Sequence, residues 1–157
     1  MASEHIATIH WRRQNQDFLS NNYSREHTWQ FDEGVKVKAS ASPHIVPLPW
    51  SSEAAVDPEE AFVASIASCH MLFFLSIAVE RNLLVDSYED RAIGKMAHND
   101  EGKIAITEVQ LCPSIVCQNA DEDLTNLIND IHHAAHEACF IANSINTKIV
   151  INPGPVS

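Results

Sequence analysis

The chain has 157 residues, of which 45% are hydrophobic and 20% are charged, a composition typical of a folded globular domain. Ten Lys and Arg residues against 21 Asp and Glu residues give a formal net charge of −11. This balance argues against a protein that attracts nucleic-acid phosphates or an anionic membrane surface by charge. We therefore expect a single domain over residues 1–157 that binds neither nucleic acid nor membranes.

The N-terminal part, residues 1–56, is predicted to form strands and an irregular loop. Its first residues have neither a basic start nor an apolar run, so we expect no export signal and a cytoplasmic location. Apolar and polar residues alternate over 35–40, as in a half-buried strand, and a turn at 32–34 pairs this strand with residues 28–31. Prolines and serine clusters predict an irregular loop over 40–55.

A central helix is predicted over residues 57–82. Asp57 is suited to the N-cap, Pro58 to the first helical position, and Glu60 to the reciprocal half of a capping box. Asn82 is suited to a left-handed residue that ends the helix.

The middle of this helix, residues 61–79, has no charged side chain and is about as long as a membrane span. It contains several polar residues and has no basic flank, which favours a helix buried on every side in a soluble core. The membrane span remains the alternative. Since one antiparallel sheet covers only one side of a helix, we expect a second chain to cover the rest, in an obligate homodimer.

Residues 84–116 predict a long antiparallel hairpin with its turn at 99–102. The phase of the apolar residues slips between Ile106 and Val109, which predicts a β-bulge in the second strand.

A second helix, 120–142, and a C-terminal strand, 146–152, complete the predicted elements. Acidic residues stand at the start of this helix, where the helix dipole favours them (Asp121, Glu122 and Asp123). Its apolar residues recur at helical spacing. The order strands, helix, hairpin, helix, strand predicts an α+β fold with antiparallel pairing.

Four cysteines are too few for a disulfide scaffold of this size. Cys69 lies in the middle of the central helix and Cys139 near the end of the second helix. By position alone each is best explained as a small buried hydrophobe. If the two helices pack together, the two thiols could meet. Cys112 and Cys117 are best explained as packing residues of a strand.

One metal-site alternative involves the second helix. His132, His136 and Cys139 share one helical face at spacings of four and three residues, which suits zinc. The zinc-protease motif fails because Phe140 stands where its second histidine must be. We therefore predict no metal site and keep a His/Cys metal-binding protein as an alternative.

Several segments resemble the OsmC/Ohr family of hydroperoxide reductases, the osmotically inducible protein C-like and organic hydroperoxide resistance proteins. The segments 57–62 (Asp-Pro-Glu-Glu-Ala-Phe) and 64–70 (Ala-Ser-Ile-Ala-Ser-Cys-His) resemble the first cysteine motif of the family. The segment 136–144 resembles the second motif, 85–90 the start of the middle hairpin, and 23–29 an early segment of the OsmC-like branch.

This resemblance implies an OsmC-like fold, in which antiparallel sheets wrap around two central helices in an intertwined homodimer with active sites at the subunit interface. It also implies a thiol-dependent peroxidase that reduces organic hydroperoxides, with hydrogen peroxide as a further candidate substrate. Cys69 would attack the peroxide and become a sulfenic acid, and Cys139 would resolve it as a disulfide. No bound cofactor is implied, and the external reductant would be a dithiol of the lipoyl type.

The resemblance further implies that Arg25 stabilises the Cys69 thiolate and that Glu59 holds this arginine. A cation is needed because apolar burial disfavours the thiolate that attacks a peroxide. Arg12 and Arg13 compete with Arg25 for this role. Ten residues of straight helix span about 15 Å, so Glu59 and Cys69 reach one guanidinium only if the helix breaks or if Arg25 and Glu59 serve the other subunit. We favour the second arrangement. A non-catalytic dimeric binding protein on the same fold remains the alternative function.

Overall fold

The computed structural model describes residues 2–118 and 123–157. The chain, predicted as one domain, packs as two compact units, Met1–Ala61 and Phe62–Ser157. Asp121 and Glu122, predicted at the start of the second helix, lie outside the described residues.

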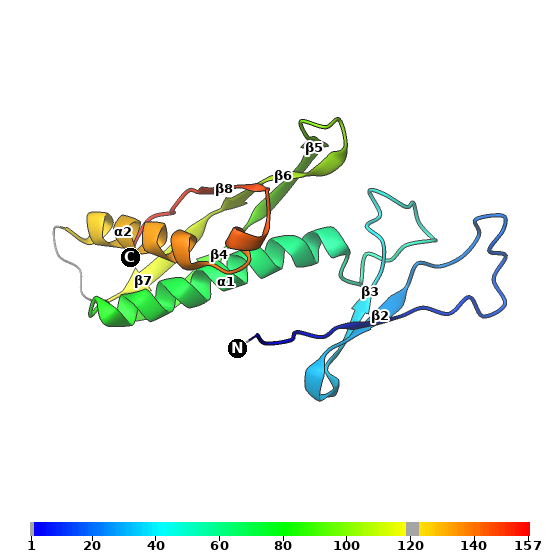
Figure 1. Cartoon of the computed structure of the whole chain (residues 1–157), viewed down its shortest axis with the longest axis horizontal. Coiled ribbons are helices and arrows are strands. Elements are labelled where there is room, and N and C mark those ends of the chain that lie inside the picture. The colour runs from blue at the N-terminus through cyan, green and yellow to red at the C-terminus, as the bar shows by residue number, and fades with distance from the viewer. Residues whose placement is uncertain (1, 119–122) are drawn as a thin grey trace. The chain divides into compact units, whose positions relative to one another are not determined.

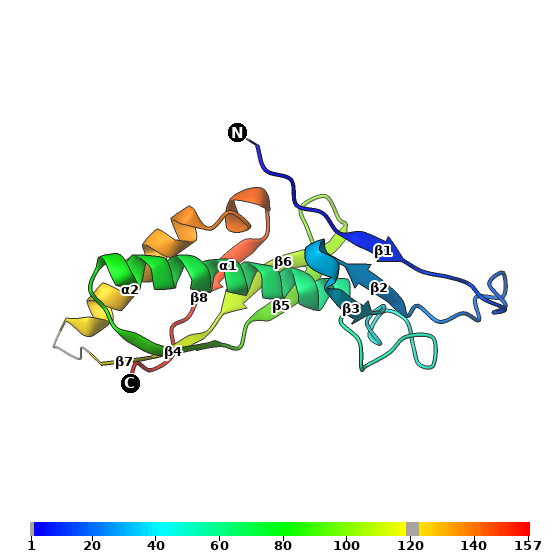
Figure 2. The same ribbon diagram turned by 90° about the horizontal axis from the view of Figure 1, so that it is seen from below.

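The first unit contains a three-stranded antiparallel sheet in the order β1-β2-β3 (Figures 1 and 2). Its strands are β1 (Thr8–His10), β2 (His27–Gln30) and β3 (Lys36–Ala39). The predicted hairpin between β2 and β3 is confirmed, and the short 3-10 helix η1 (Asp32–Gly34) forms its turn. Strand β1 was not predicted, because it is only three residues long and fully exposed.

The helix α1 (Pro58–Glu80) begins and ends where the sequence predicts. Its capping box is reciprocal: the Glu60 amide donates to Asp57 Oδ1 at 2.8 Å, and the Asp57 amide donates to Glu60 Oε2 at 3.3 Å. Beyond the last turn Asn82 has a positive φ of 55°, and the Leu83 amide returns to the Ala78 carbonyl at 2.9 Å. Local side-chain chemistry therefore defines both ends of α1.

Only one face of α1 is buried within the chain. Ile66, His70, Phe74 and Ala78 recur every four residues and form this buried face. One sheet layer and one helix cover this single stripe within one chain, and the expectation that a second chain covers the other sides of α1 stays a prediction. By length and composition alone α1 also satisfies the criterion for a membrane span, which core helices of soluble proteins satisfy as well.

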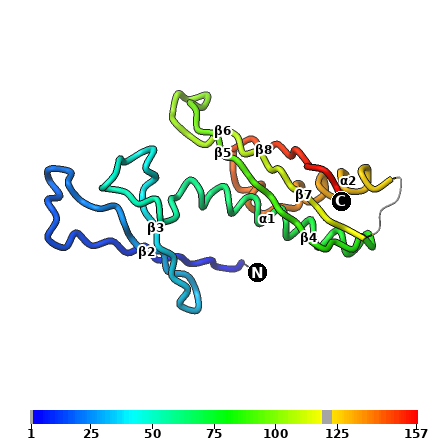
Figure 3. The backbone as a smooth tube through the Cα atoms, turned by 180° about the vertical axis from the view of Figure 1, so that it is seen from behind, coloured from blue at the N-terminus to red at the C-terminus, as the bar shows by residue number. Residues whose placement is uncertain are grey.

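In the second unit each long strand of the predicted hairpin is divided into two shorter strands. Strand β4 (Val85–Asp90) pairs antiparallel with β7 (Pro113–Cys117), and β5 (Ile93–His98) pairs antiparallel with β6 (Ile104–Leu111). The last strand, β8 (Lys148–Ile151), joins the edge of β6 in parallel, as the tube in Figure 3 shows. The prediction of antiparallel pairing is thus wrong for β8 and correct for the other strand pairs described.

The predicted bulge lies in β6. Lys95 of β5 faces Glu108, but the next residue, Met96, faces Ile106, so Thr107 is the extra residue. The bulge restores the apolar phase, and Val109 is fully buried as a result.

The second helix, α2 (Leu124–Ala138), is shorter than the predicted 120–142. It ends because Cys139 has an extended backbone (φ −64°, ψ 113°), and the short 3-10 helix η2 (Ala142–Ser144) follows. The apolar spacing continues past this point, so periodicity alone overestimated the length of α2.

The two helices and the β4–β7 pair surround one core in the second unit (Figures 1 and 2). Phe74 and Ala78 of α1, Ile115 of β7, and Ile128 and Ile131 of α2 are nearly inaccessible to solvent. A second, smaller core joins the beginning of α1 to β6 (Ile66, Val109 and Leu111). These two cores fix the position of the middle of α1, where Cys69 lies.

Candidate functional site

The two helices of the second unit bring the thiols of Cys69 and Cys139 together. The two side chains lie close enough to influence each other's ionisation, although the residues are 70 positions apart in the sequence. Cys69 comes from the middle of α1, and Cys139 from the residue that caps the C-terminus of α2. Both cysteines are free thiols. The sequence raised the possibility that the two thiols come together if the helices pack, and the packing of α1 against α2 confirms it.

The two thiols differ in their environment. Cys69 is half-buried, whereas Cys139 is only 1% exposed. Burial raises the pKa of the Cys139 thiol, while the Ala142 amide, which donates to its sulfur at 3.4 Å, acts in the opposite direction. The neighbouring Cys69 thiol raises the pKa of Cys139 further. Cys139 is therefore kept as a thiol beside a more accessible partner.

A pair of buried histidines lies beside the cysteines on the same two helices. His70 Nε2 and His132 Nδ1 are 3.0 Å apart and share a hydrogen bond. Burial lowers the pKa of both imidazoles to about 4, and for His70 the nearby His132 and His136 act in the same direction. This pair was not predicted, because His70 and His132 are 62 positions apart and no local pattern links them.

The metal-binding alternative finds no support in the described part of the chain. Among residues 2–118 and 123–157, no group of three or more His, Cys, Asp or Glu side chains could hold a metal ion. His132 of the proposed ligand set is buried against His70, so its ring is turned into the core.

Cys112 and Cys117 stand at the two ends of β7 as free thiols. The Cys112 amide donates to Asp90 Oδ1 at 2.7 Å, which ties the end of β6 to β4. Burial raises the pKa of Cys117, and Asp86 acts in the same direction. Cys117 packs in the core of the second unit, as expected of a strand cysteine, and the role of Cys112 as a packing residue stays a prediction.

Arg25 lies in the first unit, just before β2. Its guanidinium donates from Nη1 to the Tyr23 carbonyl at 2.6 Å and from Nη2 to Asn21 Oδ1 at 2.7 Å. The guanidinium carbon is also 3.7 Å from the centre of the Tyr23 ring, a cation–π contact. Several contacts thus hold the side chain of Arg25 in one orientation.

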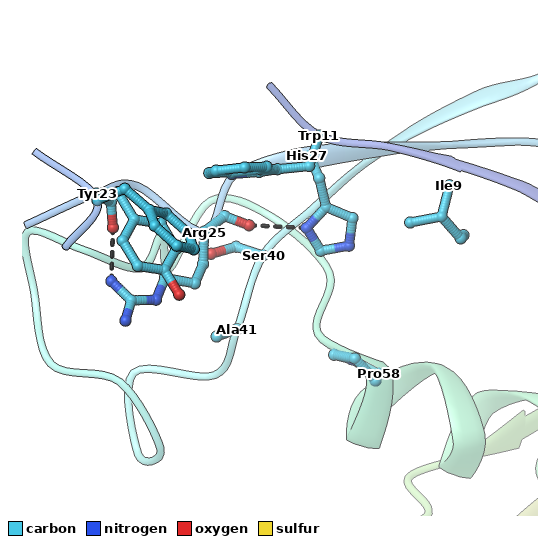
Figure 4. Close-up of a pocket in the computed structure, with 9 residues that line it drawn as sticks. Ile9, Trp11, Tyr23, Arg25, His27, Ser40, Ala41 and Pro58 are labelled. Atoms are coloured by element: carbon cyan, nitrogen blue, oxygen red, sulfur yellow. Dashed lines mark hydrogen bonds between the residues drawn. The ribbon is translucent and has the colours of Figure 1, made fainter. Parts of the chain in front are cut away.

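Arg25 lines a cavity of about 520 Å³ in the first unit, which Figure 4 shows. Trp11, Phe18 and Tyr23 form one aromatic wall, with ring centres 4.7–5.8 Å apart. His27 also faces this cavity, but both of its nitrogens are occupied, by the Arg25 carbonyl and by the Trp29 indole. The cavity is therefore mostly apolar, with the guanidinium of Arg25 in its lining. No sequence pattern predicted this aromatic wall.

Glu59, the predicted partner of Arg25, lies in the first turn of α1. Its Oε2 atom is buried and has no hydrogen-bond partner among the described residues. In this part of the chain Arg25 and Glu59 form no ion pair. Helix α1 runs from Pro58 to Glu80 as one element, which excludes the alternative with a break between Glu59 and Cys69. The roles of Arg25 and Glu59 remain predictions.

Comparison with known proteins identifies relatives along the whole chain. The sequence matches the OsmC-like protein family over residues 51–153. An OsmC-like protein of unknown function from Vibrio cholerae has 50% identity and a TM-score of 0.94, over 98% of this chain and 100% of that chain. None of the curated proteins matches the sequence significantly.

Two more distant solved structures share the fold. An organic hydroperoxide resistance protein from Elizabethkingia anophelis is 15% identical with a TM-score of 0.69, over 100% of this chain and 97% of that chain. The organic hydroperoxide resistance protein OhrB of Bacillus subtilis is also 15% identical, with a TM-score of 0.62 over 97% and 98% of the two chains. With the family match over residues 51–153, which include both cysteines, the chain belongs to the OsmC-like protein family.

Proposed function

We propose that this protein is a thiol-dependent peroxidase that reduces organic hydroperoxides, with hydrogen peroxide as a further substrate. The observation that carries the proposal is the pair of neighbouring free thiols at Cys69 and Cys139, which differ in exposure. Two solved structures with this fold are named organic hydroperoxide resistance proteins, which supports the same chemistry.

The exposure of the two thiols supports a division of their roles. Cys69 is the more accessible sulfur, so it attacks the distal peroxide oxygen as a thiolate. The O–O bond breaks, the alkoxide takes up a proton and leaves as an alcohol, and Cys69 becomes a sulfenic acid. Cys139, buried beside it, then attacks the sulfenic sulfur; a disulfide forms and water leaves.

The catalytic cycle closes by thiol–disulfide exchange. An external dithiol attacks the Cys69–Cys139 disulfide through a mixed disulfide, is itself oxidised, and returns both protein thiols. We propose a lipoyl-type dithiol as this reductant, which the family resemblance implies. The protein needs no bound cofactor in this cycle, and we propose that it works in the cytoplasm.

Arg25 and Glu59 are proposed to act on the Cys69 of a second copy of the chain. Glu59 and Cys69 are ten residues apart on one continuous helix, about 15 Å along its axis, which is too far for one guanidinium to bridge. Oε2 of Glu59 is buried and has no hydrogen-bond partner within residues 2–118 and 123–157, which supports a further partner for this carboxylate. Arg25 would then provide the positive charge that favours the thiolate.

The homodimer that this arrangement requires is supported by the exposed face of α1. Opposite its buried stripe, α1 presents small residues together with Leu72 and Val79, which are 60% and 75% exposed. Next to Cys139, Phe140 is 71% exposed. Large exposed apolar side chains on an uncharged helix face favour a protein–protein contact.

Thiol counting tests the proposal. The reduced protein is mixed with one equivalent of an alkyl hydroperoxide, and its free thiols are titrated before and after. We expect the loss of two of the four thiols, with one alcohol formed per peroxide. Mass mapping should assign the new disulfide to Cys69 and Cys139. If all four thiols persist and the peroxide is not consumed, the protein is a non-catalytic binding protein on the same fold.

Single cysteine variants separate the two steps. Cys69→Ser should abolish peroxide consumption, because no thiolate remains at the accessible position. Cys139→Ser should still consume one equivalent and accumulate a Cys69 sulfenic acid that a dimedone probe traps. Cys112→Ser is the matched control and should behave as the wild type. The roles of the two cysteines are reversed if Cys139→Ser is inert and Cys69→Ser yields the trapped sulfenic acid.

A further inference from the structure

The imidazoles of His70 and His132 form a polar cross-link inside an otherwise apolar contact between α1 and α2. The side chains are 1% and 3% exposed, and their rings are nearly parallel, with an angle of 9° between the planes. The ring of Phe74 packs against His132 at 4.5 Å between centres and closes one side of the pair. Neither ring has a role in the peroxide chemistry proposed above.

The hydrogen bond between the two rings holds a single proton. One nitrogen donates and the other accepts, so the pair exists only when the facing nitrogens are not both protonated. The remaining nitrogens, Nδ1 of His70 and Nε2 of His132, are buried and have no hydrogen-bond partner among the described residues. At least one of the two rings must therefore be neutral for this contact to exist.

Stability alone does not explain the pair. A hydrogen bond contributes about 0.5–1.5 kcal/mol net, whereas a buried polar atom without a partner costs about 1–3 kcal/mol. The free-energy cost of the two buried nitrogens without a partner among the described residues thus offsets the gain from the single bond between His70 and His132. Two apolar side chains of similar volume would fill this space without that cost.

The position of the pair suggests what it provides. On α1, His70 directly follows Cys69; on α2, His132 precedes Cys139 by seven residues, about two helical turns. Apolar contacts between helices tolerate small shifts, but a hydrogen bond weakens steeply when its length or angle changes. A bond at 3.0 Å therefore fixes the rotation and the relative height of the two helices close to the cysteines.

We propose that the hydrogen bond between His70 and His132 positions the sulfurs of Cys69 and Cys139 for disulfide formation, a role that rests on the redox function proposed above. The histidines are positioning residues: they touch neither sulfur nor peroxide in this scheme. Loss of their bond lets α1 and α2 shift and lowers the effective concentration of one thiol at the other. The first step, attack of Cys69 on peroxide, does not depend on this bond.

The effective concentration of one thiol at the other directly measures how well the two sulfurs are positioned. The protein is equilibrated in mixtures of reduced and oxidised glutathione, quenched in acid and alkylated, and the Cys69–Cys139 disulfide is quantified by mass mapping. This exchange consumes one glutathione disulfide and releases two glutathione thiols, and it needs no peroxide. The measurement therefore stands even if the chain proves to have no peroxidase activity.

Four variants make the test specific. His132→Leu and His70→Leu break the bond from either helix and should lower the effective concentration at least about tenfold, as a misplacement of about 1 Å would. His132→Asn keeps an amide near the position of Nδ1 and should stay within about threefold of the wild type. Ile128→Val, a conservative cut in the same core, lowers stability by about 0.5–1.5 kcal/mol and should leave the effective concentration unchanged.

Two results would overturn the proposal. One is an unchanged effective concentration in the folded leucine variants, His132→Leu and His70→Leu. The other is an equal fall in Ile128→Val, which would mean that any loss of core packing has the same effect. Circular dichroism checks the folding of every variant before the titration. If one leucine variant does not fold, the other leucine variant and His132→Asn still decide between these outcomes.

Discussion

Gly94 of β5 lies against Val63 of α1 so closely that a Cβ atom on the glycine would stand 2.5 Å from Val63 Cγ2. The helix and the sheet approach each other here because the glycine has no side chain. Val63 is β-branched and short, so it has no flexible end that could move away. This contact fixes the start of α1, about two turns before Cys69.

Gly94→Ala should therefore destabilise the protein by about 1–3 kcal/mol, the usual cost of overpacking. Urea unfolding measures this loss. Val63→Ala removes the obstructing methyl groups, and in that background the Gly94 substitution should cost much less. Gly154→Ala is the matched control, because its added Cβ would be no closer than 3.4 Å to a neighbour. Equal costs in both Val63 backgrounds would contradict the contact.

Acid should destabilise the protein through His70 and His132. Their folded-state pKa values lie near 4, below the ordinary value of 6.5, so the unfolded chain binds more protons between these pH values. The contribution of the two neutral histidines to the free energy of unfolding is thus fully present above about pH 6.5. It falls as the pH drops towards 4, by up to about 1.4 kcal/mol per pH unit for each histidine. Urea unfolding between pH 7.5 and 4.5 measures the slope.

The double variant His70→Leu/His132→Leu should flatten this slope. Burial also raises the pKa of the Asp90 carboxyl in the folded state, and this acts with the opposite sign, favouring the folded protein as the pH falls. Because the double variant keeps Asp90, the difference between the two slopes isolates the histidines. An unchanged slope in the double variant would show that other groups cause the acid sensitivity.

Local patterns sufficed where neighbouring residues determine the structure. The ends of α1 were predictable because Asp57, Glu60 and Asn82 act on backbone groups within one turn. The bulge at Thr107 was predictable because it shifts the alternation of apolar residues within a single strand.

Other features depend on residues far apart in the sequence, so no local pattern could reveal them. The bond between His70 and His132 joins residues 62 positions apart. Periodicity carried the prediction of α2 past Cys139, whereas the backbone turns extended there. The pairing of Cys69 with Cys139 followed only from the family resemblance, because spacing alone does not show that two helices pack together.

Replacing Arg25 should slow the first chemical step. If its guanidinium favours the Cys69 thiolate, Arg25→Gln should lower the rate of sulfenic acid formation at neutral pH on the order of 10²-fold, the usual cost of losing one electrostatic stabiliser. Rapid-mixing kinetics with an alkyl hydroperoxide and a dimedone trap measures this rate. Arg91→Gln removes the same charge from an exposed arginine that has no proposed role and serves as the control. Equal losses in both variants would assign the effect to overall charge.

Leu72 should lie in the homodimer interface, because it is 60% exposed on the face of α1 opposite the core. In a twofold-symmetric dimer each substitution acts twice, and one buried leucine contributes about 1.5–3 kcal/mol. Leu72→Asp loses this contribution in both copies and also places a charge in the interface, so it should convert a dimer into monomers at micromolar concentration. Sedimentation velocity measures the change.

Ile104→Asp, at a residue of β6 that is 67% exposed, is the control and should leave the dimer intact. A wild-type monomer, or a dimer that Leu72→Asp does not weaken, would remove the basis for placing Arg25 and Glu59 beside the Cys69 of a second copy.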